Sequence, residues 1–451
     1  MEKLFSLQKH GTTVPRELLA GLTTFLTMAY ILTLNPGILG GIKGLTPGAV
    51  FTATAVASAI ATLCMAFIAN LPVALAPCVG LNSFFTYIVV HKMGYSWQLA
   101  LTAVFLEGIV FIILSIFNVR EAIAAAIPFN LKKAVTVGIG LYVAFIGFEK
   151  AGMITRGEGT ILGLGSLSDP KVFLAVIGLV LIIILHSLNV PGAIFFGILF
   201  TTILGIPMGI TPKPALNWKP FSMPEMFPRF RFDFTLAHLL NFKFFTVFFT
   251  FLFVDIFDTI GILIGVTTSA GLIEKDGTIP RLKQAFLADA VGTIAGATLG
   301  TSTVTSHVES TVGVAAGGRT GLTALSTGLL FLLALFFWPV FQLIPSPAAF
   351  PALIFVGFLM MAPVVEINFK DPTEGIPAFL AILMMPFAYS TANVVVYSIA
   401  DGIVYGILAY VILKVVTRKL KEISGITWFL FIVFILKFLL EGGLKIILKI
   451  K

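Results

Sequence analysis

Long runs of apolar residues, separated by short polar segments, follow one another along almost the whole chain. A helix needs about 20 mostly apolar residues to cross a bilayer, and the pattern predicts fourteen such segments, two of them interrupted. We expect membrane spans near residues 18–39, 48–69, 71–90, 97–117, 132–153, 171–188, 191–210, 243–272, 285–299, 300–316, 320–343, 349–366, 375–390 and 394–416.

The third and tenth spans are not plain apolar helices. LPVALAPCVGLNSFF (71–85) contains two prolines, and GTSTVTSHVESTVGVAAGG (300–318) alternates β-branched with hydroxyl residues before a glycine-rich half. Irregular backbone is tolerated at membrane depth only where it is buried in protein or lines a cavity. We therefore expect short extended segments near 73–77 and 303–307 to pair as antiparallel strands at the midplane, each followed by a half-helix.

The positions of these interruptions indicate an internal repeat. Each is third in a group of seven spans, and paired broken spans at corresponding positions of two halves are typical of a transporter binding site. Because seven is odd, the second half should be inverted relative to the first. The half-helices should begin near Asn82 and Glu309, where free amide groups and partial positive charge are available to a ligand.

The segments outside the spans predict the orientation of the chain. With the N-terminus inside, inner segments hold fifteen Lys or Arg and outer segments ten, five of them in the long connection 211–243. An excess of basic residues marks the cytoplasmic side, so we expect both termini in the cytoplasm and the protein in the cell membrane. A last apolar stretch, 427–440, is short and followed by lysines, so we expect it to lie in the membrane interface.

Composition supports a membrane protein and narrows its class. The 451 residues are 58% hydrophobic and 11% charged, against about 25% charged in soluble domains. The net charge of +8 is spread between apolar runs, which favours membrane topology over nucleic-acid binding. The two cysteines, Cys64 and Cys78, form no metal-binding or disulfide pattern. We expect no metal, no cofactor and no catalytic residue.

Acidic side chains within the spans are informative because they are costly. A carboxylate at the bilayer centre costs about 2.5–3.5 kcal/mol even on a lenient insertion scale. Asp255 and Asp258 are three residues apart in span 8 and share a helical face with Thr259. Two carboxylates this close share proton affinity, which suits a proton-coupled carrier. Structural roles are the simpler interpretation for the other acids, which are Glu107, Glu149, Asp289, Glu366 and Asp401.

Three motifs carry a resemblance to a known family. FDTIG, TSTVTSHVES…GVAAGGRTGLTA (301–324) and LPVALAPCVGLNSFF resemble the nucleobase/ascorbate transporter (xanthine/uracil permease) family, specifically its AzgA-like hypoxanthine/adenine/guanine permease branch. The similarity extends from GLTTFLTMAYIL (21–32) to YSIADGI (397–403). It implies an all-α polytopic fold like that of uracil permease, with two inverted seven-span repeats.

In such permeases spans 1–4 and 8–11 form a core domain, and spans 5–7 and 12–14 form a gate domain. The resemblance therefore implies that 1–118 and 243–343 are the core, 119–210 and 344–416 the gate, 211–242 an extracellular connection, and 417–451 a cytoplasmic or interfacial tail.

The resemblance also implies which residues hold the substrate. The base-binding carboxylate of span 8 falls on Asp255, and that of span 10 falls on Glu309. The polar residue of broken span 3 falls on Asn82, and Asp258 matches a second acidic position of the branch. We expect Asp258, with Glu309, to couple transport to a proton.

Further residues surround these positions in the sequence. Phe85 is a candidate for stacking on the base, and Thr259, Ser310 and His307 are expected to support the site. The family commonly has Tyr at the position of His307, and Ala or Gly at that of Cys78. Neither departure touches the carboxylates, but both could tune specificity.

A purine nucleobase suits these side chains. The base is neutral, and its N–H donors lie beside ring-nitrogen acceptors, so carboxylates can accept from it while Asn82 and half-helix amides donate. Because the base brings no charge, accumulation needs a coupled ion. A buried carboxylate is the simplest proton carrier, so we expect proton symport rather than sodium symport.

Alternatives from other classes fit the sequence less well. An anion carrier of the same fold, such as a sulfate permease, would need a cation or bare half-helix ends at the site. An intramembrane aspartyl protease needs its two Asp on neighbouring helices, and a channel or structural role leaves the interrupted spans unexplained. The sequence does not rank hypoxanthine, adenine, guanine and xanthine, and it leaves monomer and homodimer open.

Overall fold

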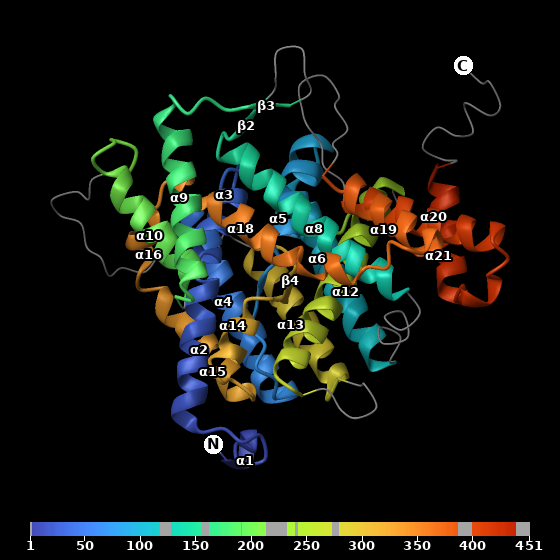
Figure 1. The fold of residues 1–451 in the computed structure, drawn as a ribbon, viewed down its shortest axis with the longest axis horizontal. Helices are drawn as coiled ribbons and strands as arrows, with labels where there is room; N and C mark the ends of the chain where they lie inside the picture. Colours follow the sequence, from blue (N-terminus) through green and yellow to red (C-terminus); the bar gives the residue numbers. More distant parts are fainter. Residues whose placement is uncertain are drawn as a thin grey trace.

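The computed structural model describes residues 2–117, 128–155, 162–190, 192–212, 232–239, 242–272, 279–386 and 399–438. Most of the predicted connection 211–242 and the tail beyond 438 lie outside these residues. Helices make up most of the described chain (Figure 1), and their order follows the predicted spans.

The first half contains, in order, α1 (Glu2–Phe5), α2 (Val14–Met28), α3 (Ile31–Leu39), α4 (Pro47–Cys64), η1 (Met65–Ala69), β1 (Leu75–Pro77), α5 (Val79–Ser83), η2 (Phe84–Lys92), α6 (Trp97–Ile116), α8 (Phe129–Lys150), β2 (Ile154–Thr155), β3 (Gly163–Leu164), α9 (Pro170–Ser187), α10 (Ala193–Gly205) and α11 (Leu236–Leu239).

The second half contains α12 (Phe242–Ser269), α13 (Leu282–Leu299), β4 (Val304–Ser306), α14 (Ser310–Ala315), α15 (Gly321–Ala334), α16 (Trp338–Gln342), α17 (Ser346–Ala349), α18 (Pro351–Met360), η3 (Ala362–Glu366), α19 (Pro372–Met384), α20 (Ile399–Val416), η4 (Leu420–Glu422) and α21 (Gly425–Phe438).

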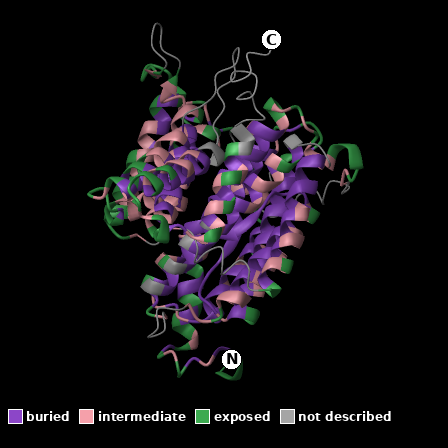
Figure 2. Ribbon diagram, turned by 90° about the vertical axis from the view of Figure 1, so that its right-hand side faces the viewer, coloured by how far each residue is buried: buried purple, intermediate pink, exposed green. Residues whose placement is uncertain are grey.

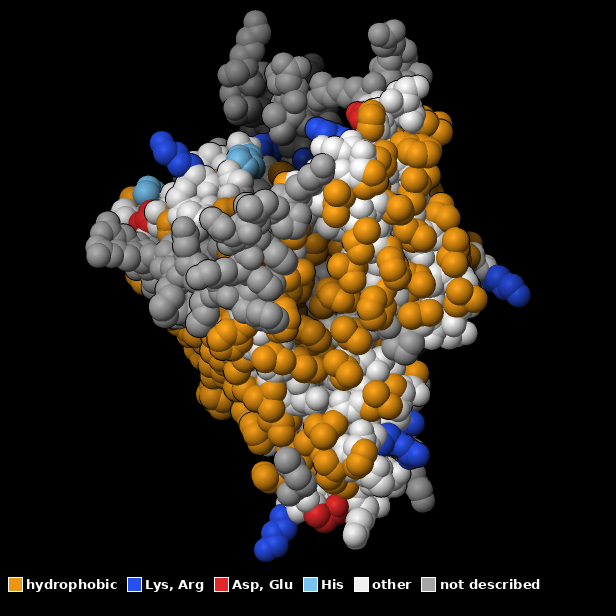
Figure 3. Space-filling view, turned by 90° about the vertical axis from the view of Figure 1, so that its left-hand side faces the viewer, with side chains coloured by type: hydrophobic (Ala, Val, Ile, Leu, Met, Phe, Trp, Pro, Cys, Tyr) orange, Lys and Arg blue, Asp and Glu red, His pale blue; other side chains and the backbone are white. Residues whose placement is uncertain are grey.

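The surface of the protein is suited to a bilayer. Among the described residues, seven helical segments are long and apolar enough to cross a membrane, and shorter apolar helices lie at predicted spans 7, 11, 13 and 14. Figure 2 shows that buried residues are concentrated between the helices. Figure 3 shows hydrophobic side chains over the middle of one face, with charged side chains at its margins. Such a belt matches a lipid environment.

The predicted pairing of the two interrupted spans is confirmed. Strand β1 pairs antiparallel with β4, and both strands are buried. The backbone bonding continues beyond each strand, because Cys78 N–H donates to the Thr303 carbonyl at 2.9 Å and His307 N–H donates to the Ala74 carbonyl at 3.0 Å. Segments more than 200 residues apart in sequence are thus joined inside the helix bundle.

Threonine hydroxyls bond to the outer edges of this two-stranded ladder. Thr62 of α4 lies 3.0 Å from both the backbone nitrogen and the carbonyl oxygen of Leu75. On the other edge, Thr293 of α13 donates to the Val304 carbonyl at 3.1 Å. Helices α4 and α13 are predicted spans 2 and 9, which are equivalent in the two halves. Both halves therefore satisfy irregular backbone in the same way, as burial in a membrane protein requires.

Removing either hydroxyl should destabilise the protein. Thr62→Val and Thr293→Val each leave a buried backbone group without its side-chain partner, which costs about 1–3 kcal/mol. We expect a lower melting temperature for both variants in detergent. Thr298→Val is the matched control, because its exposed hydroxyl bonds only within α13. Equal melting of Thr62→Val, Thr293→Val and this control would show that the edge bonds contribute nothing.

Only one of the two half-helices begins where the sequence predicts. Glu309 directly precedes α14, as expected. Helix α5 begins at Val79, not near Asn82, because the strand ladder ends at Cys78 and the chain turns into a helix at once. The Asn82 N–H consequently donates to the Cys78 carbonyl inside the helix, at 2.8 Å, and is not a free donor at its start.

The two halves of the chain interleave. Helix α13 packs against α4 and α6, and α15 packs against α2 and α4. Helix α8 packs against α18 and α19, and the approach of α18 depends on glycine: a Cβ atom added at Gly357 would lie 2.4 Å from the Gly140 carbonyl oxygen. Small residues that let two helix backbones approach are typical of membrane interfaces.

The apolar stretch predicted at 427–440 is largely contained in helix α21. This helix packs against α20, and the Phe434 ring contacts the rings of Phe249 and Phe253 on α12, with centroids 6.2 and 6.3 Å apart. Part of the apolar face of α21 is therefore covered by protein. Interfacial placement of this segment stays a prediction.

Candidate substrate-binding site

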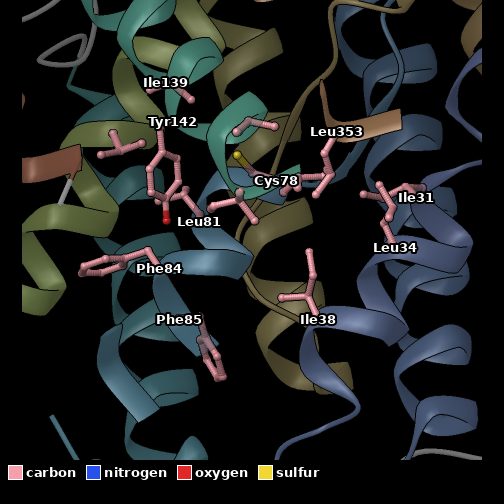
Figure 4. Packing of buried hydrophobic residues seen from close by; sticks show 14 of the residues in the cluster. Ile31, Leu34, Ile38, Cys78, Leu81, Phe84, Phe85, Ile139, Tyr142 and Leu353 are labelled. Carbon is pink, nitrogen blue, oxygen red and sulfur yellow. The ribbon is translucent and has the colours of Figure 1, made fainter. Parts of the chain in front are cut away.

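A small cavity lies where the paired strands and their half-helices face α8 and α18. Its volume is about 30 Å³, which is the share of one water molecule. Figure 4 shows Ile139 of α8 and Leu353 of α18 near Cys78, which follows β1. The cavity is lined by Tyr30, Cys78, Val79, Gly80, Asp258, Ile262, His307, Val308 and Glu309 on one side, and by Ile139, Val143, Val356 and Met360 on the other.

One carboxylate oxygen of Asp258 on α12 accepts hydrogen bonds, and the other has no partner among the described residues. Its Oδ2 atom accepts a hydrogen bond from Thr305 Oγ1 at 3.3 Å and a weaker one from Cys78 Sγ at 3.6 Å. Its buried Oδ1 atom has no hydrogen-bond partner within the described part of the chain. A buried acceptor without a donor is costly, so this oxygen is suited to accept an N–H group from a ligand.

Glu309 reaches the same cavity from the start of α14. The Tyr30 hydroxyl donates to Glu309 Oε1 at 2.5 Å, and both side chains are buried. Tyr30 lies in the short break between α2 and α3, so its hydroxyl joins predicted span 1 to predicted span 10. The bond holds one oxygen of the carboxylate and leaves the second available to another donor.

His307 and Ser310 lie at the two ends of the segment that joins β4 to α14. His307 lines the cavity, and its Nε2 atom has no hydrogen-bond partner among the described residues. The Ser310 hydroxyl accepts from the Ala74 N–H at 3.0 Å. Ser310 thus ties α14 to the residue before β1, whereas His307 offers a ring nitrogen to the cavity.

Asn82 belongs to a buried amide network rather than to the cavity wall. Its amide nitrogen donates to Asn35 Oδ1 at 2.5 Å, and its carbonyl oxygen accepts from the Ser302 hydroxyl. Asn35 in turn donates to Thr54 and Thr301 at 2.6 and 2.8 Å. The network joins α3, α4 and α5 to the segment before β4. The structure does not bring Asn82 into the cavity lining.

Asp255 and Thr259 lie beside the site rather than in it. The Thr259 hydroxyl is 3.0 Å from Asp255 Oδ1 and 2.9 Å from Asp289 Oδ1 of α13. Asp255 is absent from the cavity wall that Asp258 lines. A three-residue step turns a helix by about 300°, which points one carboxylate toward the cavity and the other toward α13.

Phe85 packs in the hydrophobic core below the site. It is fully buried, and its ring centroid lies 6.5 Å from that of Phe251 on α12. Figure 4 shows Phe84 and Phe85 on the side to which the Tyr142 hydroxyl points. Neither phenylalanine lines the cavity. Stacking of Phe85 on a bound base would therefore need a rearrangement.

Sequence reasoning missed two residues of the site, Tyr30 and Cys78. A signal for Tyr30 was present, because a buried tyrosine hydroxyl in an apolar span needs a hydrogen-bond partner. Cys78 was named as a departure from the family pattern that could tune specificity, but not as a residue of the cavity wall, although it directly follows the interrupted strand.

None of the described residues that line the cavity is lysine or arginine. Two carboxylates, a phenol, a thiol and an imidazole provide its polar character. Such a lining is suited to a neutral ligand with N–H donors, and it is unsuited to an anion, which two carboxylates would repel.

Comparison with known proteins places the chain in a family. Residues 15–397 match the profile of the Permease family named Xan_ur_permease. The chain belongs to this permease family. The permease is 40% identical to the adenine permease AdeP of Escherichia coli, over 97% of this chain and 95% of AdeP. It is 43% identical to the guanine/hypoxanthine permease PbuG of Bacillus subtilis, over 97% of this chain and 99% of PbuG.

The fold of the permease has solved counterparts at low sequence identity. The transmembrane domain of the cyanobacterial bicarbonate transporter BicA superposes with a TM-score of 0.63 at 14% identity, covering 82% of this chain and 95% of that domain. This fold has two inverted repeats of seven spans, so the architecture predicted from the interrupted spans is confirmed.

Proposed function

We propose that this permease imports purine nucleobases together with a proton by alternating access. The observation that carries the proposal is the cavity between the strand pair and α8/α18, which contains Asp258 and Glu309 and, among its described lining residues, no basic side chain. A purine places N–H donors along one edge, and carboxylates accept such donors with charge-assisted bonds.

The relatives support the substrate class. AdeP is named for adenine, and PbuG for guanine and hypoxanthine. Both align with almost the whole of this chain. Because three purines that differ in their exocyclic groups are named among the relatives, the proposal extends to the class of purine bases.

The cavity lining favours this proposal over the anion-carrier alternative. BicA transports bicarbonate by its name, but its likeness to this chain concerns the fold alone. Stabilising an anion in a low-dielectric site needs positive charge or unpaired amide donors. In the cavity of this permease, Asp258 and Glu309 supply negative charge instead.

The size and position of the cavity support alternating access. A space for one water is too small for a purine, so the base can enter only when α8 and α18 move away from the strand pair. We propose that the core segments 1–118 and 243–343 hold the base and move relative to the gate segments 119–210 and 344–416. Rigid movement of one bundle against another is the usual way such repeats expose a central site.

The structure favours an exchange of roles between the two aspartates of α12. We propose that Asp258 and Glu309 contact the base, since both line the cavity, and that Asp255 takes part in proton coupling. Asn82 then positions the strand pair through Asn35 and Ser302 and does not touch the ligand. We also propose, from the distribution of basic residues in the sequence, that the permease lies in the cell membrane with both termini in the cytoplasm.

Uptake in cells without endogenous purine transport tests the function. We expect radiolabelled hypoxanthine to accumulate, with uptake falling as the external pH rises, because the inward proton gradient that drives symport becomes smaller. A protonophore should abolish accumulation, and replacement of sodium should not. Cells that carry an empty vector are the control. Uptake of sulfate in place of purines would favour the anion carrier, and sodium-dependent uptake would contradict the proton assignment.

A further inference from the structure

Three buried side chains on α12 and α13 form a hydrogen-bonded cluster that the substrate cavity does not include. The Thr259 hydroxyl lies 3.0 Å from Asp255 Oδ1 and 2.9 Å from Asp289 Oδ1. Thr259, Asp255 and Asp289 are each fully buried. The two carboxylate oxygens that face the hydroxyl are therefore at most about 6 Å apart, a separation at which like charges interact strongly.

A count of hydrogens indicates the protonation state of this cluster. Both distances are those of good hydrogen bonds, but a threonine hydroxyl has one proton to donate, and its lone pairs can only accept. The hydroxyl can donate to one carboxylate. The second bond then requires a carboxylic acid that donates its own proton to the threonine oxygen. The geometry is satisfied by one ionised and one protonated aspartate.

We infer that Asp255, Thr259 and Asp289 form the site that holds the coupled proton. The inference rests on the proposed function and makes it more specific, since it separates proton binding from base binding. The proton is shared by two carboxylates of the core, while Asp258, one helical turn along α12, contacts the base. Loading would transfer a proton from the outer solution to one of the two carboxylates, and unloading would release it to the inner solution.

Further acidic side chains lie on the elements around the cluster. Glu107 of α6 accepts from the Thr303 hydroxyl at 2.9 Å, and Asp258 lies three residues from Asp255 on α12. The lysines on the packed helices lie within the first or last two turns. The ionisable residues with described side chains on the elements that pack against α12 and α13 or line the cavity are Tyr30, Cys64, Cys78, Tyr87, His91, Lys92, Glu107, Lys132, Lys133, Tyr142, Glu149, Lys150, His238, His307, Glu309, Tyr405, Tyr410 and Lys414, in addition to Asp258 and Lys283 on the two helices themselves.

Repulsion between the charge of Asp258 and that of the neighbouring carboxylate pair would couple base binding to proton binding. A base that donates N–H groups to Asp258 needs this carboxylate in its ionised form. The negative charge of Asp258 then favours a proton on the neighbouring pair. By reciprocity, a proton on the pair favours an ionised Asp258 and so favours the base. A symporter needs such mutual enhancement, because the loaded carrier has to move with both ligands.

Asp255→Asn and Asp289→Asn test the inference in proteoliposomes. An amide is neutral like the protonated acid and can donate to Thr259, but it neither gains nor loses a proton near neutral pH. Either variant should still exchange labelled for unlabelled hypoxanthine across the membrane. An inward proton gradient should raise hypoxanthine accumulation in the wild type and should leave it unchanged, within about twofold, in the variants. A response as steep as that of the wild type in both variants would overturn the inference.

Thr259 provides a second test that leaves both carboxylates in place. Thr259→Ser keeps the bridging hydroxyl and should keep the gradient response, whereas Thr259→Val removes it and should shift the external pH at which accumulation is half-maximal. Thr250→Val is the matched control, because that hydroxyl of α12 bonds to the Thr246 carbonyl at 2.8 Å. Identical pH profiles for Thr259→Val and Thr250→Val would contradict a proton at this cluster, even where the aspartate variants fail to fold.

Infrared spectroscopy of the purified protein can detect a protonated carboxyl group directly. The carbonyl stretch of a protonated carboxylic acid should be present in the wild type at neutral pH and should be missing in both Asp255→Asn and Asp289→Asn. An unchanged band would overturn the inference. Absence of hypoxanthine binding by the wild type is a separate result, because it would refute the proposed function and leave the infrared assignment intact.

Discussion

Replacing Asp258 with asparagine is expected to abolish uptake of purine bases while the protein stays folded in the membrane. Asparagine has nearly the same shape and can still accept from the Thr305 hydroxyl. Its amide nitrogen, however, cannot accept the N–H donors of a base. A hydrogen bond to a charged group contributes about 1.5–3 kcal/mol, so affinity for hypoxanthine should fall about 10- to 150-fold. Equilibrium binding to purified protein measures this loss.

Asp371→Asn is the matched control for this prediction. Hydrogen bonds from Lys419 and Thr373 lower the pKa of Asp371 to about 2, so the same change from carboxylate to amide removes a full negative charge there too. Asp371 lies at the start of α19, outside the cavity. The control should bind hypoxanthine like the wild type. Equal affinity of the Asp258 and Asp371 variants would remove Asp258 from the base-binding site.

The pairing of strands β1 and β4 could be predicted because its signals are local. Prolines in one span and alternating hydroxyl residues in another are incompatible with continuous helices, and their equal place in two groups of seven spans identified the partner. The start of α5 was less predictable. The register of the ladder determines where the strand ends, and this register depends on Thr303, which is far away in sequence.

The choice between Asp255 and Asp258 could not be made from the sequence. Three residues apart on a helix, both carboxylates lie on one broad face, and only the positions of α8, α13 and α18 decide which of them borders the cavity. The contact between Tyr30 and Glu309 was equally inaccessible. It joins residues 279 positions apart, and no spacing rule connects spans 1 and 10 at the level of single side chains.

Asp289 illustrates the difference between a costly residue and a functional one. In the sequence it was one of five intramembrane acids for which helix packing or snorkelling was a sufficient explanation. In the structure it approaches the same hydroxyl as Asp255. Packing and proton binding are then compatible, because a shared proton is what allows two buried carboxylates to lie this close.

Glu309→Gln is expected to abolish uptake, and Tyr30→Phe is expected to weaken it. Glutamine replaces a carboxylate oxygen with an amide that cannot accept from the base, so the affinity for hypoxanthine should fall about 10- to 150-fold. Phenylalanine at position 30 keeps the carboxylate but removes the hydroxyl that holds its Oε1 atom at 2.5 Å. Loss of this positioning bond should raise KM about tenfold, with a smaller effect on the maximal rate.

Tyr410→Phe separates positioning at the site from the general loss of a tyrosine hydroxyl. The Tyr410 hydroxyl donates to the Glu422 carbonyl at 3.2 Å, at the far end of α20, so its removal should leave KM for hypoxanthine unchanged. If Tyr30→Phe matched Tyr410→Phe, the bond to Glu309 would have no part in binding. If Glu309→Gln also kept the affinity of the wild type, the base would have to be held elsewhere, because Asp258 and Glu309 are the two carboxylates on the described wall of the cavity.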